Sequence, residues 1–188
     1  MNADAHGGAS RSDVERSEVA APRTARLVGA PPGEGDLGFL CALLGDRRVG
    51  ETLGGVRGEE EVAEILAAHR AHWAREGFGY WIWRDRASGE PIARGGLSRA
   101  SVQGEPVVEV GWAVRPDPGG EGLATELGAC SLQVAARLGI PQVVAYALPH
   151  NVASRRVMEK LGMRYDRDFV HGWGSHALYR TEVPGHPG

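Results

Sequence analysis

The chain has 188 residues, 42% hydrophobic and 24% charged, which fits one globular domain and excludes fibrous and wholly disordered proteins. Its formal net charge of −3 provides no general positive surface for a phosphate backbone, so we expect no nucleic acid partner. No apolar run approaches a bilayer-spanning length and the charged N-terminal stretch lacks an export signal, so we expect a cytoplasmic protein without a membrane partner.

The first part of the chain predicts a leader, a strand and two helices. Residues 1–23 are rich in Ala, Gly, Ser and charge, so we expect a disordered leader before a single domain spanning residues 24–188. TARLVGAPP is typical of a strand, and the leucines after it predict a short helix that ends at Gly45. GEEEVAEILAAHRAHWAREG predicts a longer helix, because its first turn is acidic and its apolar residues form one stripe.

The central part predicts an antiparallel meander followed by a parallel crossover. YWIWRDR, PIARGGLSR and VVEVGWAVR are β-rich runs separated by the turn residues of ASGE and VQGE. Apolar residues from Leu123 to Leu138 then recur at helical spacing up to Gly139. QVVAYAL is apolar on both faces, as a central strand is, so the strand, helix and strand in succession indicate a parallel pair.

The last part predicts one helix and two strands. NVASRRVMEKLG is typical of a helix capped by Asn151 and closed by Gly162. RYDRDFVHGW and SHALYRTE predict two closing strands, which complete a mixed α/β domain.

The cysteines, tryptophans and paired histidines indicate structural roles. Cys41 and Cys130 lie in apolar helical patterns, so we expect reduced thiols and no disulfide. His69 and His72 are one helical turn apart without a third ligand at a useful spacing, so we expect no metal site. A histidine on an apolar stripe, such as His69, is more often a hydrogen-bonded core residue than a cleft residue, and its role stays open here. The tryptophans of YWIWRDR are interpreted as core or cleft-wall packing.

The stretch PDPGGEGLATEL lies between a strand end and a helix start. Such a turn presents unpaired N–H groups at the positive end of the helix dipole, without Cβ atoms to block an anion. A P-loop is excluded, because Leu123 and Ala124 stand where Lys and Ser or Thr are required. The dinucleotide fingerprint also fits poorly, because Thr125 stands at the position of its third glycine. In addition, no acidic residue lies near the end of the following strand to bind a ribose.

Two motifs, VGWAVRPDPGGEGLATE and NVASRRVMEKLGM, resemble the cofactor motifs of the GNAT superfamily of acetyl-coenzyme A dependent N-acetyltransferases. The resemblance runs from about Thr24 to Glu182 and is closest to the branch of the ribosomal-protein-alanine acetyltransferases. It implies an α/β fold with a central, mixed, mostly antiparallel sheet, a splayed parallel pair and flanking helices. It also implies acetyl-CoA as the acyl donor, with no metal.

The resemblance also assigns residues to the cofactor, position by position. The pantetheine arm would follow the strand that ends near Val114, and the pyrophosphate would lie on the glycine turn, with Asn151 on the other flank. Gly119 stands where the family usually has Arg or Gln, so backbone donors carry more of the binding. The assigned cofactor residues are Trp112, Ala113, Val114, Gly119, Gly120, Glu121, Gly122, Leu123, Ala124, Thr125 and Asn151.

The proton-transfer groups depart from the family pattern. Met158 stands where many relatives carry a Tyr that acts as the general acid, and Met158 has no proton to give. Ser154 lies on the inward stripe of the same helix and is our candidate to hydrogen-bond the leaving thiolate. Its hydroxyl could instead only satisfy nearby backbone. Tyr146 stands where some relatives carry a Glu and is a poor base at neutral pH.

Glu109, the one charged residue of VVEVGWAV, is our candidate base. The alternative is a structural ion pair with Arg84, Arg94 or Arg99 on neighbouring strands.

These features predict an enzyme that transfers acetyl directly to a primary amine, either a small molecule or a protein N-terminal α-amine. A non-catalytic acyl-CoA-binding module is the alternative, favoured by the missing Tyr, the missing Glu and Gly119. A nucleotide-binding oxidoreductase is a third hypothesis, and a homodimer stays open.

Overall fold

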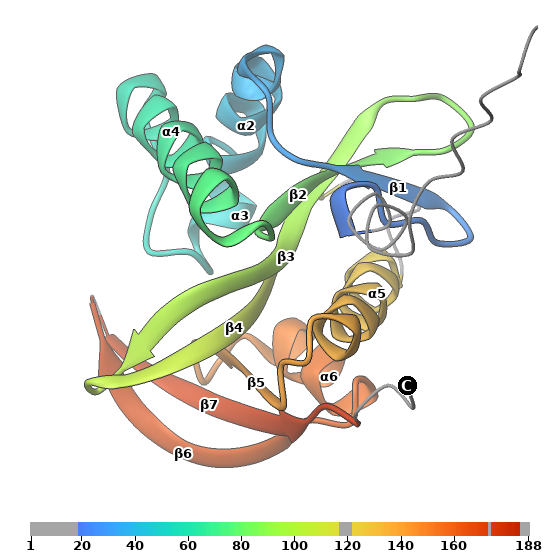
Figure 1. The fold of residues 1–188 in the computed structure, drawn as a ribbon. Coiled ribbons are helices and arrows are strands. Elements are labelled where there is room, and N and C mark those ends of the chain that lie inside the picture. Colours follow the sequence, from blue (N-terminus) through green and yellow to red (C-terminus); the bar gives the residue numbers. More distant parts are fainter. Residues whose placement is uncertain (1–18, 117–121, 173, 185–188) are drawn as a thin grey trace, which may run out of the picture.

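The computed structural model describes residues 19–116, 122–172 and 174–184. One seven-stranded sheet, in the order β1-β2-β3-β4-β5-β7-β6, forms its centre. Helices lie on both faces of this sheet (Figure 1). The expected fold class, a mixed, mostly antiparallel sheet flanked by helices, is confirmed.

The N-terminal half contains four antiparallel strands and the helices inserted between the first two of them. The strands are β1 (Leu27–Ala30), β2 (Tyr80–Asp85), β3 (Pro91–Val102) and β4 (Glu105–Val114). The helices are η1 (Glu34–Asp36), α2 (Leu37–Leu44), α3 (Arg47–Gly50) and α4 (Glu59–Glu76). The single turn α3 was not predicted; its N-cap is Asp46, whose side chain accepts a 2.8 Å hydrogen bond from the Arg48 N–H.

The C-terminal half begins with the crossover helix and ends in a hairpin. Its elements are α5 (Leu123–Arg137), β5 (Gln142–Ala147), α6 (Val152–Lys160), β6 (Arg164–His171) and β7 (Gly174–Glu182). β5 is parallel to β4, and the two strands are paired at Glu109 and Val144. β5 then pairs antiparallel with β7, and β7 with β6. The predicted parallel pair is therefore present at the centre of the sheet.

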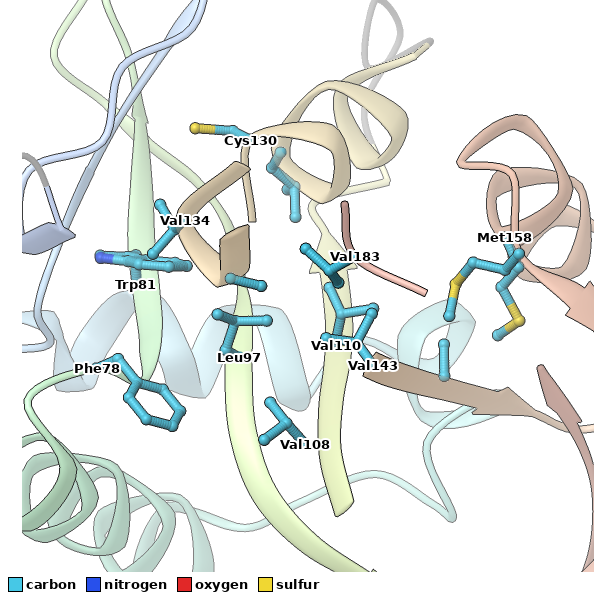
Figure 2. Packing of buried hydrophobic residues seen from close by; sticks show 14 of the residues in the cluster. Phe78, Trp81, Leu97, Val108, Val110, Cys130, Val134, Val143, Met158 and Val183 are labelled. Atoms are coloured by element: carbon cyan, nitrogen blue, oxygen red, sulfur yellow. The ribbon is translucent and has the colours of Figure 1, made fainter. Parts of the chain in front are cut away.

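Two apolar clusters hold the helices on opposite faces of the sheet. In the larger cluster, Val134 of α5 packs with Trp81 and Leu97 of the sheet (Figure 2). In the smaller cluster, residues of α2 and α4 pack on Ile82 and Ala113. Because both faces are covered along β2 to β4, the position of β4 relative to the helices is fixed by packing.

The tryptophans of β2 confirm the expectation of core packing. Trp81 and Trp83 are fully buried, and each indole N–H is satisfied by a backbone carbonyl. Trp81 donates to Val19 at 2.9 Å and Trp83 to Gly95 at 3.0 Å. Buried indoles with a paired N–H contribute large apolar area without an unsatisfied donor.

The fold begins before the expected end of the leader. Val19 is 5% exposed and belongs to the larger apolar cluster, and Arg23 forms an isolated bridge with Val28. Residues 19–23 therefore pack on the fold, and Val19 also accepts the hydrogen bond of the Trp81 indole. The expected leader ended at residue 23, so its last five residues belong to the fold. The rest of the expected leader, residues 1–18, lies outside the described residues.

None of the described helices is both long and apolar enough to cross a bilayer. Cys41 lies in α2 and Cys130 in α5, and both are free thiols.

Candidate active site

A cavity of about 620 Å³ opens between β4 and β5. Its floor is near Glu109, the residue of β4 that pairs with Val144 of β5. Beyond that point the strands no longer form a ladder, so the C-terminal part of β4 faces the cavity instead of β5. Other lining residues come from α3, α4 and the start of α6, and from the strands β2, β3, β5, β6 and β7.

The predicted pantetheine strand forms one wall of this cavity. Trp112, Ala113 and Val114 all line it. β4 is fully paired with β3 on its other edge, with Trp112 opposite Gly95 and Val114 opposite Ala93. The edge toward β5 has no such ladder along these residues, and its backbone groups are therefore available to a ligand.

The glycine turn ends at the N-terminus of α5. Gly122 has a φ of 80°, a left-handed conformation that favours glycine, and no side chain caps the helix. The Glu126 N–H bonds back to the Gly122 carbonyl at 2.9 Å, so the N–H groups of residues 123–125 have no place in the intrahelical ladder. Ala124 lines the cavity, whereas the Leu123 side chain is buried in the core. Three predicted residues of the turn, Gly119, Gly120 and Glu121, lie outside the described residues.

The first turn of α5 is tied to the segment before β1. Glu126 accepts hydrogen bonds from the Thr24 hydroxyl at 2.5 Å, the Arg26 N–H at 2.8 Å and the Arg26 Nε at 2.6 Å. These contacts hold the helix N-terminus in place through the Glu126 side chain and do not use the first N–H groups of the helix.

Glu109 is held by two phenols at the floor of the cavity. Its Oε2 accepts a 3.0 Å hydrogen bond from the Tyr146 hydroxyl, and its Oε1 accepts a 3.4 Å hydrogen bond from the Tyr80 hydroxyl. Burial raises the pKa of Glu109, although the Tyr146 hydrogen bond and the charge of Arg94 oppose that rise. A carboxylate with a raised pKa is a better base near neutral pH than an exposed one.

The structural ion pair that we considered for Glu109 is not found among the described residues. Arg84 pairs with the buried Asp36, and Arg99 pairs with Glu76 at 2.6 Å. Arg94 lies over the ring of Tyr80, with its guanidinium carbon 5.0 Å from the ring centroid.

A glycine makes room for the Tyr80 hydroxyl. A Cβ atom on Gly111 would lie 2.3 Å from the Tyr80 Oη and 3.2 Å from the Glu109 Oε1. Burial raises the pKa of both Tyr80 and Tyr146 above the ordinary phenol value. Both phenols therefore stay protonated at neutral pH and act as hydrogen-bond donors to Glu109.

The two histidines of α4 differ in role. The His72 Nδ1 lies 2.9 Å from the Phe78 carbonyl, and its Nε2 accepts from the Arg99 N–H at 3.0 Å, so His72 is the hydrogen-bonded structural histidine. His69 lines the cavity with its ring 5.2 Å from that of Tyr80, and its Nδ1 has no partner in the described part of the chain. Of the two roles left open for His69, the position at the cavity is the one observed, and the hydrogen-bonded core role is not observed among the described residues. Burial lowers the pKa of His69 to about 3, so its ring is neutral.

The start of α6 forms the opposite wall. The Asn151 side chain accepts a 3.1 Å hydrogen bond from the Ser154 N–H, which confirms Asn151 as the cap. The Ser154 hydroxyl lines the cavity and makes no hydrogen bond to any residue that the structure describes, so the backbone-satisfying alternative is not observed. Met158, at the position of the family's acidic Tyr, is 1% exposed.

Several lining residues had no predicted place in the site, and Tyr80, Tyr146 and Arg94 are the ones nearest to Glu109 in the network described above. They come from β2, β5 and β3, and they converge on Glu109 only through the register of the sheet. The sequence signal that was available is alternation, since Glu109 and Gly111 share one face of β4.

The comparisons with known proteins agree with this geometry. Residues 26–164 match the Acetyltransferase (GNAT) domain family. An uncharacterized protein of Bacillus subtilis (strain 168), YkkB, is 25% identical over 126 residues, which are 66% of this chain and 73% of YkkB.

Solved structures share the fold. An acetyltransferase from Agrobacterium tumefaciens str. C58 superposes with a TM-score of 0.75 at 21% identity, covering 96% of this chain and 99% of that one. RimL, a ribosomal L7/L12 alpha-N-protein acetyltransferase solved in complex with coenzyme A, superposes with a TM-score of 0.72 at 16% identity, covering 88% and 98%.

Proposed function

Because this chain belongs to the GNAT acetyltransferase family, we propose that it transfers the acetyl group of acetyl-CoA directly to a primary amine. The observation that carries the proposal is the cavity between β4 and β5, which reaches Ala124 of α5, Ser154 of α6 and Glu109 at the floor. Its volume is within the range of small-molecule sites.

The residues present fit the proposed donor. The uncapped N-terminus of α5 and the bare backbone at Gly122 suit a diphosphate, and the open edge of β4 from Trp112 to Val114 suits the amides of a pantetheine arm. When bound there, acetyl-CoA supplies the acetyl thioester. Asn151 holds the start of α6 against the same cavity.

The protein supplies three functions for the transfer. Glu109 takes the proton of the acceptor ammonium, directly or through water, while Tyr80 and Tyr146 fix its orientation. Strand-edge N–H groups of β4 stabilise negative charge on the carbonyl oxygen. The Ser154 hydroxyl hydrogen-bonds the thiolate that leaves.

We propose transfer without a covalent enzyme intermediate. Neither Cys41 nor Cys130 lines the cavity between β4 and β5, and burial raises the pKa of the Cys130 thiol, which makes it a weaker nucleophile. The acceptor is a small-molecule amine or a protein N-terminal α-amine.

The test is a screen for thiol release. Purified protein is incubated with acetyl-CoA and a panel of amines and peptides, free thiol is measured, and the acetylated product is identified by mass. Product with any amine supports the proposal. Binding of coenzyme A by calorimetry with no thiol release across the panel would instead establish a non-catalytic acyl-CoA-binding module.

A further inference from the structure

Arg94 lies at the wall of the cavity and forms no ion pair with a described residue. No carboxylate oxygen of the described residues lies within 4.0 Å of its guanidinium, and its Nε is buried without a hydrogen-bond partner in those ranges. Burial lowers the pKa of Arg94, which reflects the free-energy cost of keeping this charge away from water. A cation held in this way, facing a cavity, is suited to an anion from outside the protein.

Two other arginines of the same sheet show the usual arrangement. Arg84 of β2 pairs with Asp36, and Arg99 of β3 pairs with Glu76 at 2.6 Å. Both of these side chains have a carboxylate of the chain itself as partner. Arg94 lies over the Tyr80 ring as Arg99 lies over the Phe78 ring. It differs from both arginines because no carboxylate of the described residues is within ion-pair distance of it.

Tyr80 holds the two opposite charges of the cavity apart. Its ring face lies against the guanidinium of Arg94, and its hydroxyl donates to the carboxylate of Glu109 at 3.4 Å. Arg94 stands opposite Ala113 on β4, and Glu109 stands four residues before Ala113 on the same face of that strand. The cavity wall therefore presents a negative group and a positive group separated by one aromatic ring.

We propose that the acceptor is a small amine that also carries a carboxylate, with its amine at Glu109 and its carboxylate on the guanidinium of Arg94. This assignment of the substrate class rests on the proposed function. Arginine is suited to the role, since its planar fork binds a carboxylate through two parallel hydrogen bonds. The unpartnered Nδ1 of the neutral His69, beside Tyr80, offers the ligand a further hydrogen bond.

The test compares amines that differ only in the carboxylate. Alanine, serine and phenylalanine are each measured against their carboxamides, with acetyl-CoA as donor and kcat/KM as the readout. We expect each free amino acid to be preferred about 10- to 100-fold, the range for hydrogen bonds to a charged group. Amine basicity does not explain such a preference, because the amine of the carboxamide is the weaker base and is more often neutral.

Two methionine variants locate the preference. In Arg94→Met the acid-to-amide ratio should fall to near one, while Arg99→Met, on the same strand and with the same loss of charge, should retain the ratio of the parent. Arg94→Met should also melt at the same temperature as the parent or higher, because a partly buried charge without an ion-pair partner is removed. A purely structural role for Arg94 predicts a lower melting temperature.

The outcomes separate this assignment from the proposed function. Equal use of acids and carboxamides by the parent, or a ratio that survives in Arg94→Met, overturns the carboxylate site and leaves amine acetylation standing. Because the carboxamide also mimics the first residue of a peptide, a preference for it would favour a protein N-terminus as acceptor. Failure to acetylate any of the six amines, or any amine of the wider panel, overturns both.

Discussion

The hydroxyl of Tyr146 donates a 3.0 Å hydrogen bond to the Oε2 of Glu109, and the two residues belong to the parallel strands β5 and β4. Glu109 is also the β4 residue that is in register with β5, through Val144. The bond therefore lies where the cavity closes. It fixes the carboxylate and stabilises its charged form, against the effect of burial on the pKa of Glu109.

Tyr146→Phe should shift the pH dependence of acetyl transfer. The lost hydrogen bond favoured ionised Glu109, so the pKa of Glu109 rises further and the acid limb of the kcat/KM profile moves to higher pH. The same amine is used for parent and variant, so that its own ionisation cancels. Tyr165→Phe, which alters an exposed tyrosine of β6, is the control. If the acid limb of the kcat/KM profile does not move, the ionisation of Glu109 does not control acetyl transfer.

Glu109→Gln should lower turnover at neutral pH by about 10²- to 10⁴-fold, the usual range for loss of a general base. The measurement is initial thiol release at saturating acetyl-CoA. Glu105→Gln is the matched control, since Glu105 lies on the same strand but forms an exposed ion pair with Arg180 at 2.9 Å. Normal specific activity in Glu109→Gln would assign Glu109 a structural role.

The same variant should change how stability depends on pH. The pKa of Glu109 is raised in the folded state above its ordinary value of 4.5, so the folded protein binds this proton more tightly than the unfolded chain does. The contribution of Glu109 to the free energy of unfolding is therefore complete below pH 4.5 and is lost as the pH rises through the folded-state pKa. Glutamine does not titrate. Urea unfolding from pH 4 to pH 8 should therefore show the variant gaining stability relative to the parent with rising pH.

Gly111→Ala should destabilise the fold and reduce activity. The new methyl group would lie 2.3 Å from the Tyr80 Oη, and overpacking of this kind costs about 1 to 3 kcal/mol of unfolding free energy. In a Tyr80→Phe background the nearest ring carbon is 3.1 Å away, so the same substitution should cost less. A double-mutant cycle in urea measures this coupling. Equal losses in both backgrounds would mean that the Tyr80 hydroxyl does not occupy the space above Gly111.

Ser154→Ala should slow turnover about 10- to 100-fold, the value of one hydrogen bond to a charged group. Binding of coenzyme A by calorimetry should hardly change, because the proposed bond forms as the thiolate leaves. The melting temperature provides an internal control: the Asn151 cap uses the Ser154 N–H, which alanine retains. An unchanged rate would remove Ser154 from the mechanism.

The helices and strands of this protein could be predicted from sequence where their apolar residues recur at a helical or strand period. The stripe of α4 and the alternation of β4 carry such signals, whereas α3, with four residues, is too short to show one. As a result Arg48, which lines the cavity from α3, had no predicted place in the site.

The proton-transfer cluster shows a different limit. Glu109 is identified from sequence as the one charged residue of VVEVGWAV, but its two phenolic partners lie 29 and 37 residues away. Alternation indicates the face of a strand but not its register with neighbours, and only register brings Tyr80 and Tyr146 to one carboxylate. The glycine turn was identified because its motif is local.

Gly122→Val tests whether the start of α5 holds the diphosphate of coenzyme A. Gly122 has a φ of 80°, so valine costs about 1 to 2 kcal/mol of unfolding free energy through backbone strain. Gly139→Val is the control: its φ is 67° and it follows the other end of the same helix. A Cβ at Gly139 meets no atom within 4 Å, and a Cβ at Gly122 meets only the Arg26 Nη2, at an ordinary contact distance of 3.4 Å. Both variants should lose similar stability in urea, but only Gly122→Val should lose coenzyme A binding by calorimetry, because its side chain obstructs the N–H groups of the turn. Equal affinities in the two variants would place the diphosphate elsewhere.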